Sequence, residues 1–213
     1  MALDAQALWA EKYAARFADA KFQEDEAREQ AFVDDTFIVY GERLRGMTAR
    51  DLLHLQVVQS PIIYSTGKIT VAHVLQFLWA LHTRNKGTFR FIHRKRMMRR
   101  VLSRRSSDPE TAAIMEISEY IGKMFMDSGG KSSGESKPIG ACWLAPIMVR
   151  LSQAVGPLDP LDGRAWADVP LPRIWQYLKA VRVMEDPKAK DYSPSDKILM
   201  EWQLEMNQSQ NGI

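Results

Sequence analysis

Apolar residues recur along most of the chain at the three- and four-residue spacing of amphipathic helices. The pattern is clearest after Thr70, a residue that can cap a helix, where Val71, Val74, Leu75 and Leu78 occupy positions i, i+3, i+4 and i+7. This spacing predicts a helix with one strongly apolar face, which we expect to lie at the centre of the core.

Capping patterns predict where other helices begin. Thr48 and Asp51 form a capping box ahead of a helix expected over 49–59, and Pro109 in SSDPE sits at the favoured first position of a helix. The SPSD motif at 193–196 predicts the start of the last helix. Two further helices are expected within IGACWLAPIMVRLSQAV and DVPLPRIWQYLKAV, the first begun or kinked by its proline.

One segment has the chemistry of a strand instead. Residues 36–40 are mostly β-branched and aromatic, and a Gly-Glu pair follows them directly. We therefore predict a mainly α fold with about seven helices and one short β-hairpin near residues 36–46.

The first thirty residues are rich in Ala, Glu, Gln and Lys, which favour helix. Trp9, Tyr13, Phe17 and Ala20 fall close to one helical face, and the other face is polar. Two interpretations stay open: a helix packed on its own domain, or an arm that packs on a partner.

A Gly- and Ser-rich stretch, DSGGKSSGESKP, interrupts the helical pattern and has the composition of a flexible linker. Together with a boundary after the N-terminal helix, this linker gives four expected parts of the chain. These are an N-terminal helix or arm (1–35), a helical core domain with a basic segment at 84–105 (36–127), the linker (128–137) and a C-terminal helical region (138–213).

Charge is distributed unevenly, although the formal net charge is only +3. Residues 1–35 carry nine acidic and four basic side chains, whereas residues 84–105 carry ten basic and no acidic ones. Such a basic segment can meet phosphate or an acidic protein surface, including residues 1–35 of the same chain or of a neighbouring copy.

No constellation of catalytic or metal-binding residues is evident. The four histidines show neither HExxH spacing nor a cysteine pair, and DSGGKSSGES lacks the spacing of a phosphate-binding loop. The single cysteine, Cys142, lies among apolar residues that would raise its pKa. We expect no enzymatic activity, no cofactor and no metal.

Neither a signal-peptide pattern nor a run of about 18 apolar residues occurs, so a cytosolic location is expected.

As a helix, the basic segment would place Phe91, Met98, Val101 and Leu102 on a narrow inner face. Cations would cover most of the remaining circumference as a partner-binding surface: Arg94, Lys95, Arg96, Arg99, Arg100, Arg104 and Arg105. No named nucleic-acid-binding module accompanies them. A protein-facing surface is favoured, and nucleic-acid binding stays open.

Two stretches carry a resemblance to a known family: FIVYGERLRGMTARDLLHLQVVQSPIIYSTGKITVAHVLQFLWAL, and the ending DVPLPRIWQYLKAVRVMEDPKAKDYSPSDKILMEWQLEMN. Together they resemble tail morphogenesis proteins of tailed bacteriophages, of the tail assembly chaperone type. The resemblance implies a mostly helical, non-enzymatic protein that keeps the tape-measure protein soluble and delivers it to the growing tail tube.

That resemblance makes tape-measure or tail-tube proteins the expected partners and the bacterial host cytoplasm the expected location. Two alternatives remain: a structural or connector protein that stays in the virion, and a nucleic-acid-binding accessory protein that uses residues 84–105.

Overall fold

Helices dominate the computed structural model, which describes residues 7, 9–33, 36–64, 68–85, 87–103, 109–125, 144–186 and 192–211. Within these residues there are nine α-helices, one π-helical turn, one 3-10 turn and one two-stranded sheet. The predicted mainly α fold is therefore confirmed. The linker expected over 128–137 and Cys142 lie outside the described residues.

The elements follow in this order: η1 (Trp9–Tyr13), α2 (Ala14–Phe32), β1 (Thr36–Val39), β2 (Glu42–Arg45), α3 (Ala49–Val57), α4 (Pro61–Tyr64), α5 (Val71–Leu81), α6 (Arg90–Ser103), α7 (Pro109–Phe125), α8 (Leu144–Ala154), η2 (Trp166–Asp168), α9 (Leu171–Glu185) and α10 (Pro194–Asn211). The structure confirms the positions at which the capping patterns predicted helices to begin. Asp51 and Thr48 exchange the two hydrogen bonds of a capping box, and Ser193 and Asp196 do the same before α10.

The hairpin predicted near residues 36–46 is confirmed. Its strands pair antiparallel, with Val39 opposite Glu42 next to a two-residue turn. Tyr40 and Gly41 both have positive φ, 48° and 67°, as a type I′ hairpin turn requires. The carboxylate of Glu116 on α7 accepts a hydrogen bond from the backbone N–H of Tyr40 and so holds the turn on that helix.

The main core lies between the hairpin and the surrounding helices. It includes fully buried side chains from β2, α5, α7, α8 and α9, among them Leu44, Leu78, Ile117, Leu151 and Ile174. Residues on both sides of the expected linker therefore contribute to the same core. The buried face of α5 contains Val74 and Leu78, as its spacing predicted, together with Phe77 and Leu81.

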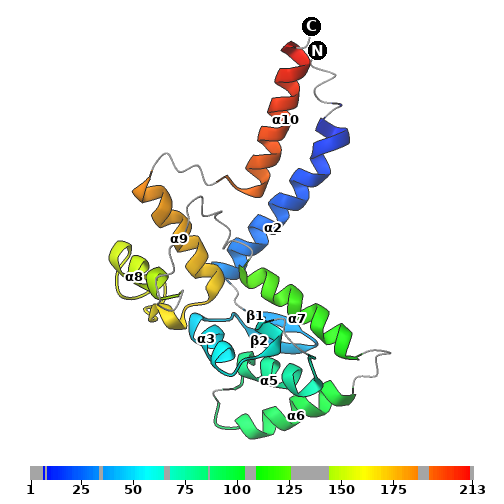
Figure 1. Cartoon of the computed structure of the whole chain (residues 1–213), viewed down its shortest axis with the longest axis vertical. Helices are drawn as coiled ribbons and strands as arrows, with labels where there is room; N and C mark the ends of the chain where they lie inside the picture. The colour runs from blue at the N-terminus through cyan, green and yellow to red at the C-terminus, as the bar shows by residue number, and fades with distance from the viewer. Residues whose placement is uncertain are drawn as a thin grey trace.

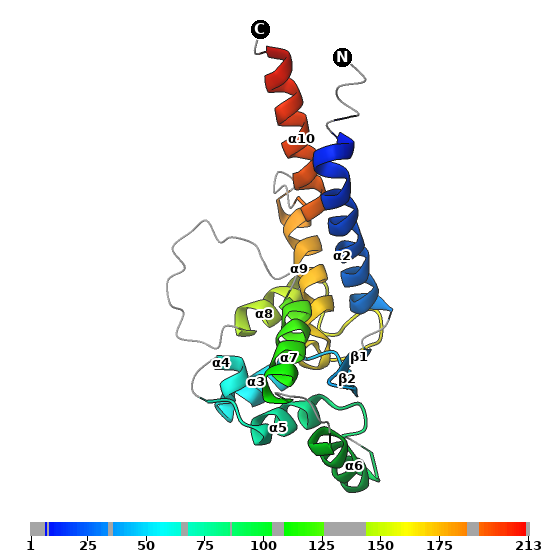
Figure 2. The same ribbon diagram turned by 90° about the vertical axis from the view of Figure 1, so that its right-hand side faces the viewer.

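Helices α2 and α10 lie side by side and extend away from this core, with both chain ends at the far tip (Figures 1 and 2). They run antiparallel and share a second, smaller apolar cluster. That cluster contains the apolar face predicted for the N-terminal helix: Trp9, Tyr13, Phe17 and Ala20, with Ile198 and Trp202 from α10. We call this pair of helices the stalk.

The base of the stalk is tied to α9 by a buried arginine. Arg173 donates from Nε to the carbonyl of Ala31 at 2.8 Å, near the end of α2. Its Nη1 contacts carboxylate oxygens of Asp159 and Asp162, each at 2.7 Å. Burial, together with the hydrogen bond to Asp159, raises the pKa of the adjacent Tyr177 to about 12.

Candidate functional site

Residues 90–103 of the basic segment form helix α6, at the end of the molecule opposite the tip of the stalk (Figures 1 and 2). Of its described side chains, only Met97 and Val101 are buried. These residues are four positions apart and so lie on one narrow stripe facing the core. The helix is therefore attached along a single line and leaves most of its circumference at the surface.

The inner face expected from the sequence is wrong in all but one residue. Val101 is buried, but Phe91 and Leu102 are 70% and 62% exposed, and Met98 is at the surface as well. The stripe that faces the core passes through Met97 instead of Met98. One residue is 100° of helix rotation, so this difference turns the other expected contacts outward.

The predicted cationic residues divide into three groups. Arg94, Lys95, Arg96 and Arg99 are exposed, and within the described part of the chain they make no ion pair. Arg100 is bound to a buried carboxylate. Arg104 and Arg105 lie outside the described residues.

Glu42 on β2 is the carboxylate that Arg100 binds. Its side chain is 3% exposed, and it accepts hydrogen bonds from Nε and Nη2 of Arg100 at 2.7 and 2.5 Å. These hydrogen bonds raise the pKa of Arg100. The Nε2 atom of His82 lies 3.4 Å from the same carboxylate. The acidic partner of α6 is therefore the hairpin.

The acidic residues of the N-terminal helix have other partners. Glu26 pairs with Lys123 of α7, Asp25 with Arg28 of its own helix, and Glu24 accepts hydrogen bonds from Ser195 of α10. Helix α2, which carries these residues, lies in the stalk and away from α6 in both views (Figures 1 and 2). The expectation that residues 1–35 of the same chain balance the basic segment is not met by these three residues.

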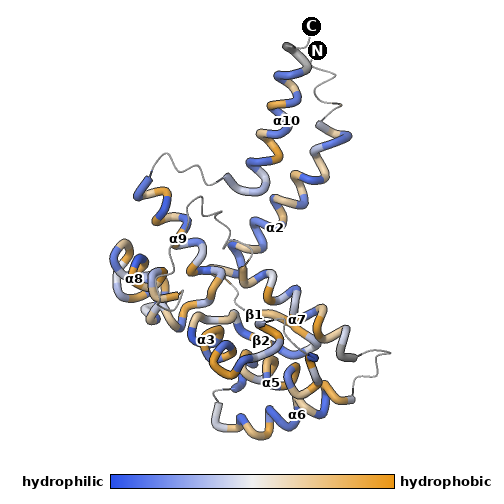
Figure 3. The backbone as a smooth tube through the Cα atoms, in the orientation of Figure 1, coloured by the Kyte–Doolittle hydropathy of each residue, from blue (hydrophilic) through white to orange (hydrophobic). Residues whose placement is uncertain are grey.

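Large apolar side chains are exposed beside the cations of α6. Hydrophilic and hydrophobic positions alternate along this helix (Figure 3). The exposed apolar residues on α6 and just before it are Phe89, Phe91, Ile92, Met98 and Leu102. We call these residues, with Arg94, Lys95, Arg96 and Arg99, the α6 surface. It combines apolar contact area with positive charge.

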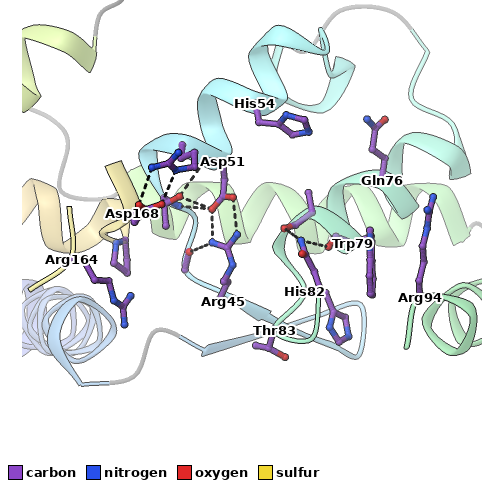
Figure 4. Close-up of a pocket in the computed structure, with 16 residues that line it drawn as sticks. Arg45, Asp51, His54, Gln76, Trp79, His82, Thr83, Arg94, Arg164 and Asp168 are labelled. Carbon is purple, nitrogen blue, oxygen red and sulfur yellow. Dashed lines mark hydrogen bonds and ion pairs between the residues drawn. The ribbon is translucent and has the colours of Figure 1, made fainter. Parts of the chain in front are cut away.

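A pocket of about 620 Å³ adjoins the α6 surface and is lined from α3, β2, α5, α6 and the segment around η2 (Figure 4). Arg94 belongs to both the pocket and the α6 surface. The charged side chains of the pocket wall are Arg45, Arg50, Asp51, Arg94, Arg164 and Asp168. Four positive and two negative charges therefore face this space.

Both aspartates of the pocket wall are already bound by arginines. Arg45 holds Asp51 through both terminal nitrogens, and Arg50 donates to the two carboxylate oxygens of Asp168 at 2.8 and 3.0 Å. Burial would raise the pKa of Asp51, but hydrogen bonds from Arg45 and Thr48 outweigh it, and the pKa lies below its usual value. Asp51 is therefore ionised at neutral pH.

Arg94 and Arg164 lie on opposite sides of the pocket in Figure 4. Arg164 is 3.1 Å from Asp162, a carboxylate that also pairs with buried Arg173. Between the two arginines, the half-buried indole of Trp79 packs against the ring of His82, with centroids 5.6 Å apart and the ring planes tilted by 33°. The result is a pocket with an aromatic wall and a cation at each side.

Sequence analysis did not predict this pocket. Its lining comes from residues 45–54, 76–85, 94 and 164–170, and no motif joins these segments. Of the predicted cationic surface, Arg94 alone lines the pocket. The two arginines Arg45 and Arg50 lie close together in the sequence, but Arg94 and Arg164 are brought alongside them only by the fold.

Within the described residues, no group of three or more His, Cys, Asp or Glu side chains is arranged to hold a metal ion. In the same residues, every helix is too short or too polar to cross a lipid bilayer.

Comparison with protein-family models, curated proteins and solved structures finds no match to this chain.

Proposed function

We propose that the protein is a non-enzymatic tail morphogenesis factor of tailed bacteriophages, of the tail assembly chaperone type. It binds a helical protein partner, the tape-measure protein or a tail-tube protein, through the α6 surface. The observation that carries this proposal is the single-line attachment of α6. Only Met97 and Val101 are buried, and five large apolar side chains and four cations beside them are exposed.

Such a surface suits an amphipathic helix with acidic flanks. Isolated exposed apolar residues are ordinary, but a group of them on one helix marks a binding surface. A helix can lay its apolar stripe on them and place its carboxylates near the cations at the rim. Covering the apolar stripe of a long helix keeps it from aggregating, which is what a tape-measure chaperone has to do.

Gene context gives the first test. A tail-tube gene on one side and a gene for a very long helical protein on the other support the proposal. If neither neighbour is a virion assembly gene, the tail-specific part of the proposal is wrong.

Co-expression with the long helical neighbour tests the surface itself. We expect the wild-type chain to keep the neighbour soluble and the double variant Phe91→Ser, Leu102→Ser to lose this effect. Val149→Ser on α8 is the matched control, because Val149 is also an exposed apolar residue but lies away from α6. Circular dichroism establishes that all variants keep their helical content. Equal solubility with the α6 variant and the control contradicts the proposal.

A second candidate, nucleic-acid binding, is favoured by one observation: Arg94, Lys95, Arg96 and Arg99 project from one helix without ion pairs in the described chain. Phosphate contacts release counterions and make affinity fall steeply with salt. The test is a DNA titration at about 50 and about 200 mM salt with these four residues changed to Ala. Arg100 stays unchanged because it holds Glu42. Binding that weakens about a thousandfold and disappears in the variant would put this function first.

A further inference from the structure

We propose that the pocket beside α6 binds an extended acidic peptide segment, with one carboxylate at Arg94 and another at Arg164. This deepens the proposed function, on which it rests only in taking a polypeptide as the partner. The segment would belong to the same partner that covers the α6 surface, since Arg94 lies on both.

Charge is the first reason. The pocket wall carries four arginines and two aspartates, and each aspartate is already held by one of the arginines. Arg94 makes no ion pair in the described chain, and Arg164 shares Asp162, which does not line the pocket, with buried Arg173. The pocket wall itself therefore has an excess of positive charge. Because walls of low dielectric strengthen the field inside a concave surface, this excess favours an anionic occupant.

The separation of those charges is the second reason. Arg94 and Arg164 lie on opposite sides of the pocket, with Arg45 and Asp51 between them (Figure 4). A single compact anion placed at one arginine does not contact the other. An extended chain spans about 3.3–3.6 Å per residue, so acidic side chains a few residues apart can meet both.

The remaining lining fits a polypeptide. A pocket of about 620 Å³ is larger than one side chain needs. The half-buried indole of Trp79 supplies flat apolar area, and His54 and Gln76 supply polar groups that can hydrogen-bond to a peptide backbone. The wall thus offers contacts for the main chain as well as for carboxylates.

A fluorescein-labelled peptide of about ten residues, alternating Glu with Ser and Gly, tests the proposal with the full-length protein. A peptide with Gln in place of Glu is the comparison. We expect the Glu peptide to bind, as measured by fluorescence anisotropy, and the Gln peptide to bind at least tenfold more weakly. We expect Arg94→Gln and Arg164→Gln each to weaken binding about fivefold, as for the loss of one partly exposed ion pair.

Arg43→Gln is the matched control, because Arg43 on β2 is an exposed arginine that neither lines the pocket nor belongs to the α6 surface. The affinity of this variant for the Glu peptide should stay within about twofold of wild type. An equal loss in Arg43→Gln, equal binding of the Gln peptide, or no binding of the Glu peptide would each overturn the proposal. Displacement of the peptide by equimolar inorganic phosphate would overturn it too, in favour of a small-anion site.

Failure here is distinguishable from failure of the proposed function. The co-expression test depends on Phe91 and Leu102, neither of which lines the pocket. If those variants lose the partner while the Glu peptide does not bind, the α6 surface is supported and the pocket proposal is wrong. If the peptide binds but the solubility of the neighbouring protein is the same with the α6 variants, the pocket proposal is supported and the proposed function is not.

Discussion

Arg100 on α6 holds the buried carboxylate of Glu42 through two hydrogen bonds, 2.7 Å from Nε and 2.5 Å from Nη2. Fifty-eight residues separate the pair in the sequence. One cation of the basic segment is therefore part of the structure, and it fastens α6 to the hairpin. The neighbouring cations Arg94, Lys95, Arg96 and Arg99 are exposed and make no ion pair within the described part of the chain.

Replacing Arg100 should destabilise the protein more than replacing its neighbour. Arg100→Ala leaves Glu42 buried without its cation, so we expect the free energy of unfolding to fall by about 2 kcal/mol. Arg99→Ala, which removes an exposed arginine without an ion pair in the described chain, should change it by less than about 0.5 kcal/mol. Urea denaturation measures both. Equal losses would mean that the Glu42 contact adds nothing.

Stability should depend on the protonation of His82. Burial lowers the pKa of His82 below 6.5, although Glu42 opposes this. Its Nδ1 accepts the backbone N–H of Arg84 at 3.0 Å, which only the unprotonated ring nitrogen can do. His82 therefore takes up a proton more readily in the unfolded chain than in the folded one. The contribution of neutral His82 to stability is complete above pH 6.5 and is lost as the pH falls below it.

We expect the free energy of unfolding to fall between about pH 7.5 and pH 5.5 in the wild type, and to fall less in His82→Gln. His54→Gln, which changes an exposed histidine, should keep the wild-type dependence. Thermal denaturation across this range measures the slopes. Identical slopes for the wild type and His82→Gln would contradict the assignment.

Replacing Arg173 should lower the free energy of unfolding strongly. Its substitution by Met leaves Asp159, which is 1% exposed, without its ion pair and frees the Ala31 carbonyl at the base of the stalk. Removing one partner of a buried pair costs about 3–5 kcal/mol. Arg150→Gln, which breaks an exposed pair with Glu185, should cost less than about 1 kcal/mol. Chemical denaturation of both variants compares the two, and similar losses would contradict the structural role of Arg173.

The stalk should loosen separately from the main core. Trp9 and Trp202 meet edge to face with centroids 5.2 Å apart, inside the apolar cluster that joins α2 to α10. Trp202→Ala should speed amide hydrogen exchange in α10 by about tenfold or more while leaving α5 and α7 unchanged. Leu204→Ala, at an exposed position of the same helix, should leave exchange near wild type. Faster exchange in α5 as well would mean that the two clusters unfold together.

Local sequence patterns determined the elements of this fold. The Thr48–Asp51 and Ser193–Asp196 capping boxes formed where the sequence placed them, and the hairpin formed at the β-branched segment. These features depend on hydrogen bonds and spacings between residues that are close in the sequence, from Thr48 and Asp51 in one capping box to Thr36 and Arg45 at the open end of the hairpin. The sequence therefore shows all the participating groups within one short stretch. The apolar face of the N-terminal helix was likewise visible as a spacing.

Only the tertiary structure decided which groups meet across those elements. The rotation of α6 that buries Met97 and exposes Met98, the capture of Arg100 by Glu42, and the placement of Arg94 and Arg164 at two sides of one pocket all join distant segments. The spacing of apolar residues predicts which face of a helix is buried only to within about one residue. Two neighbouring faces of α6 both carry apolar residues. The choice between them, and with it the exposed face of α6, was made by packing on the core and by the contact of Arg100 with Glu42, which local spacing does not specify.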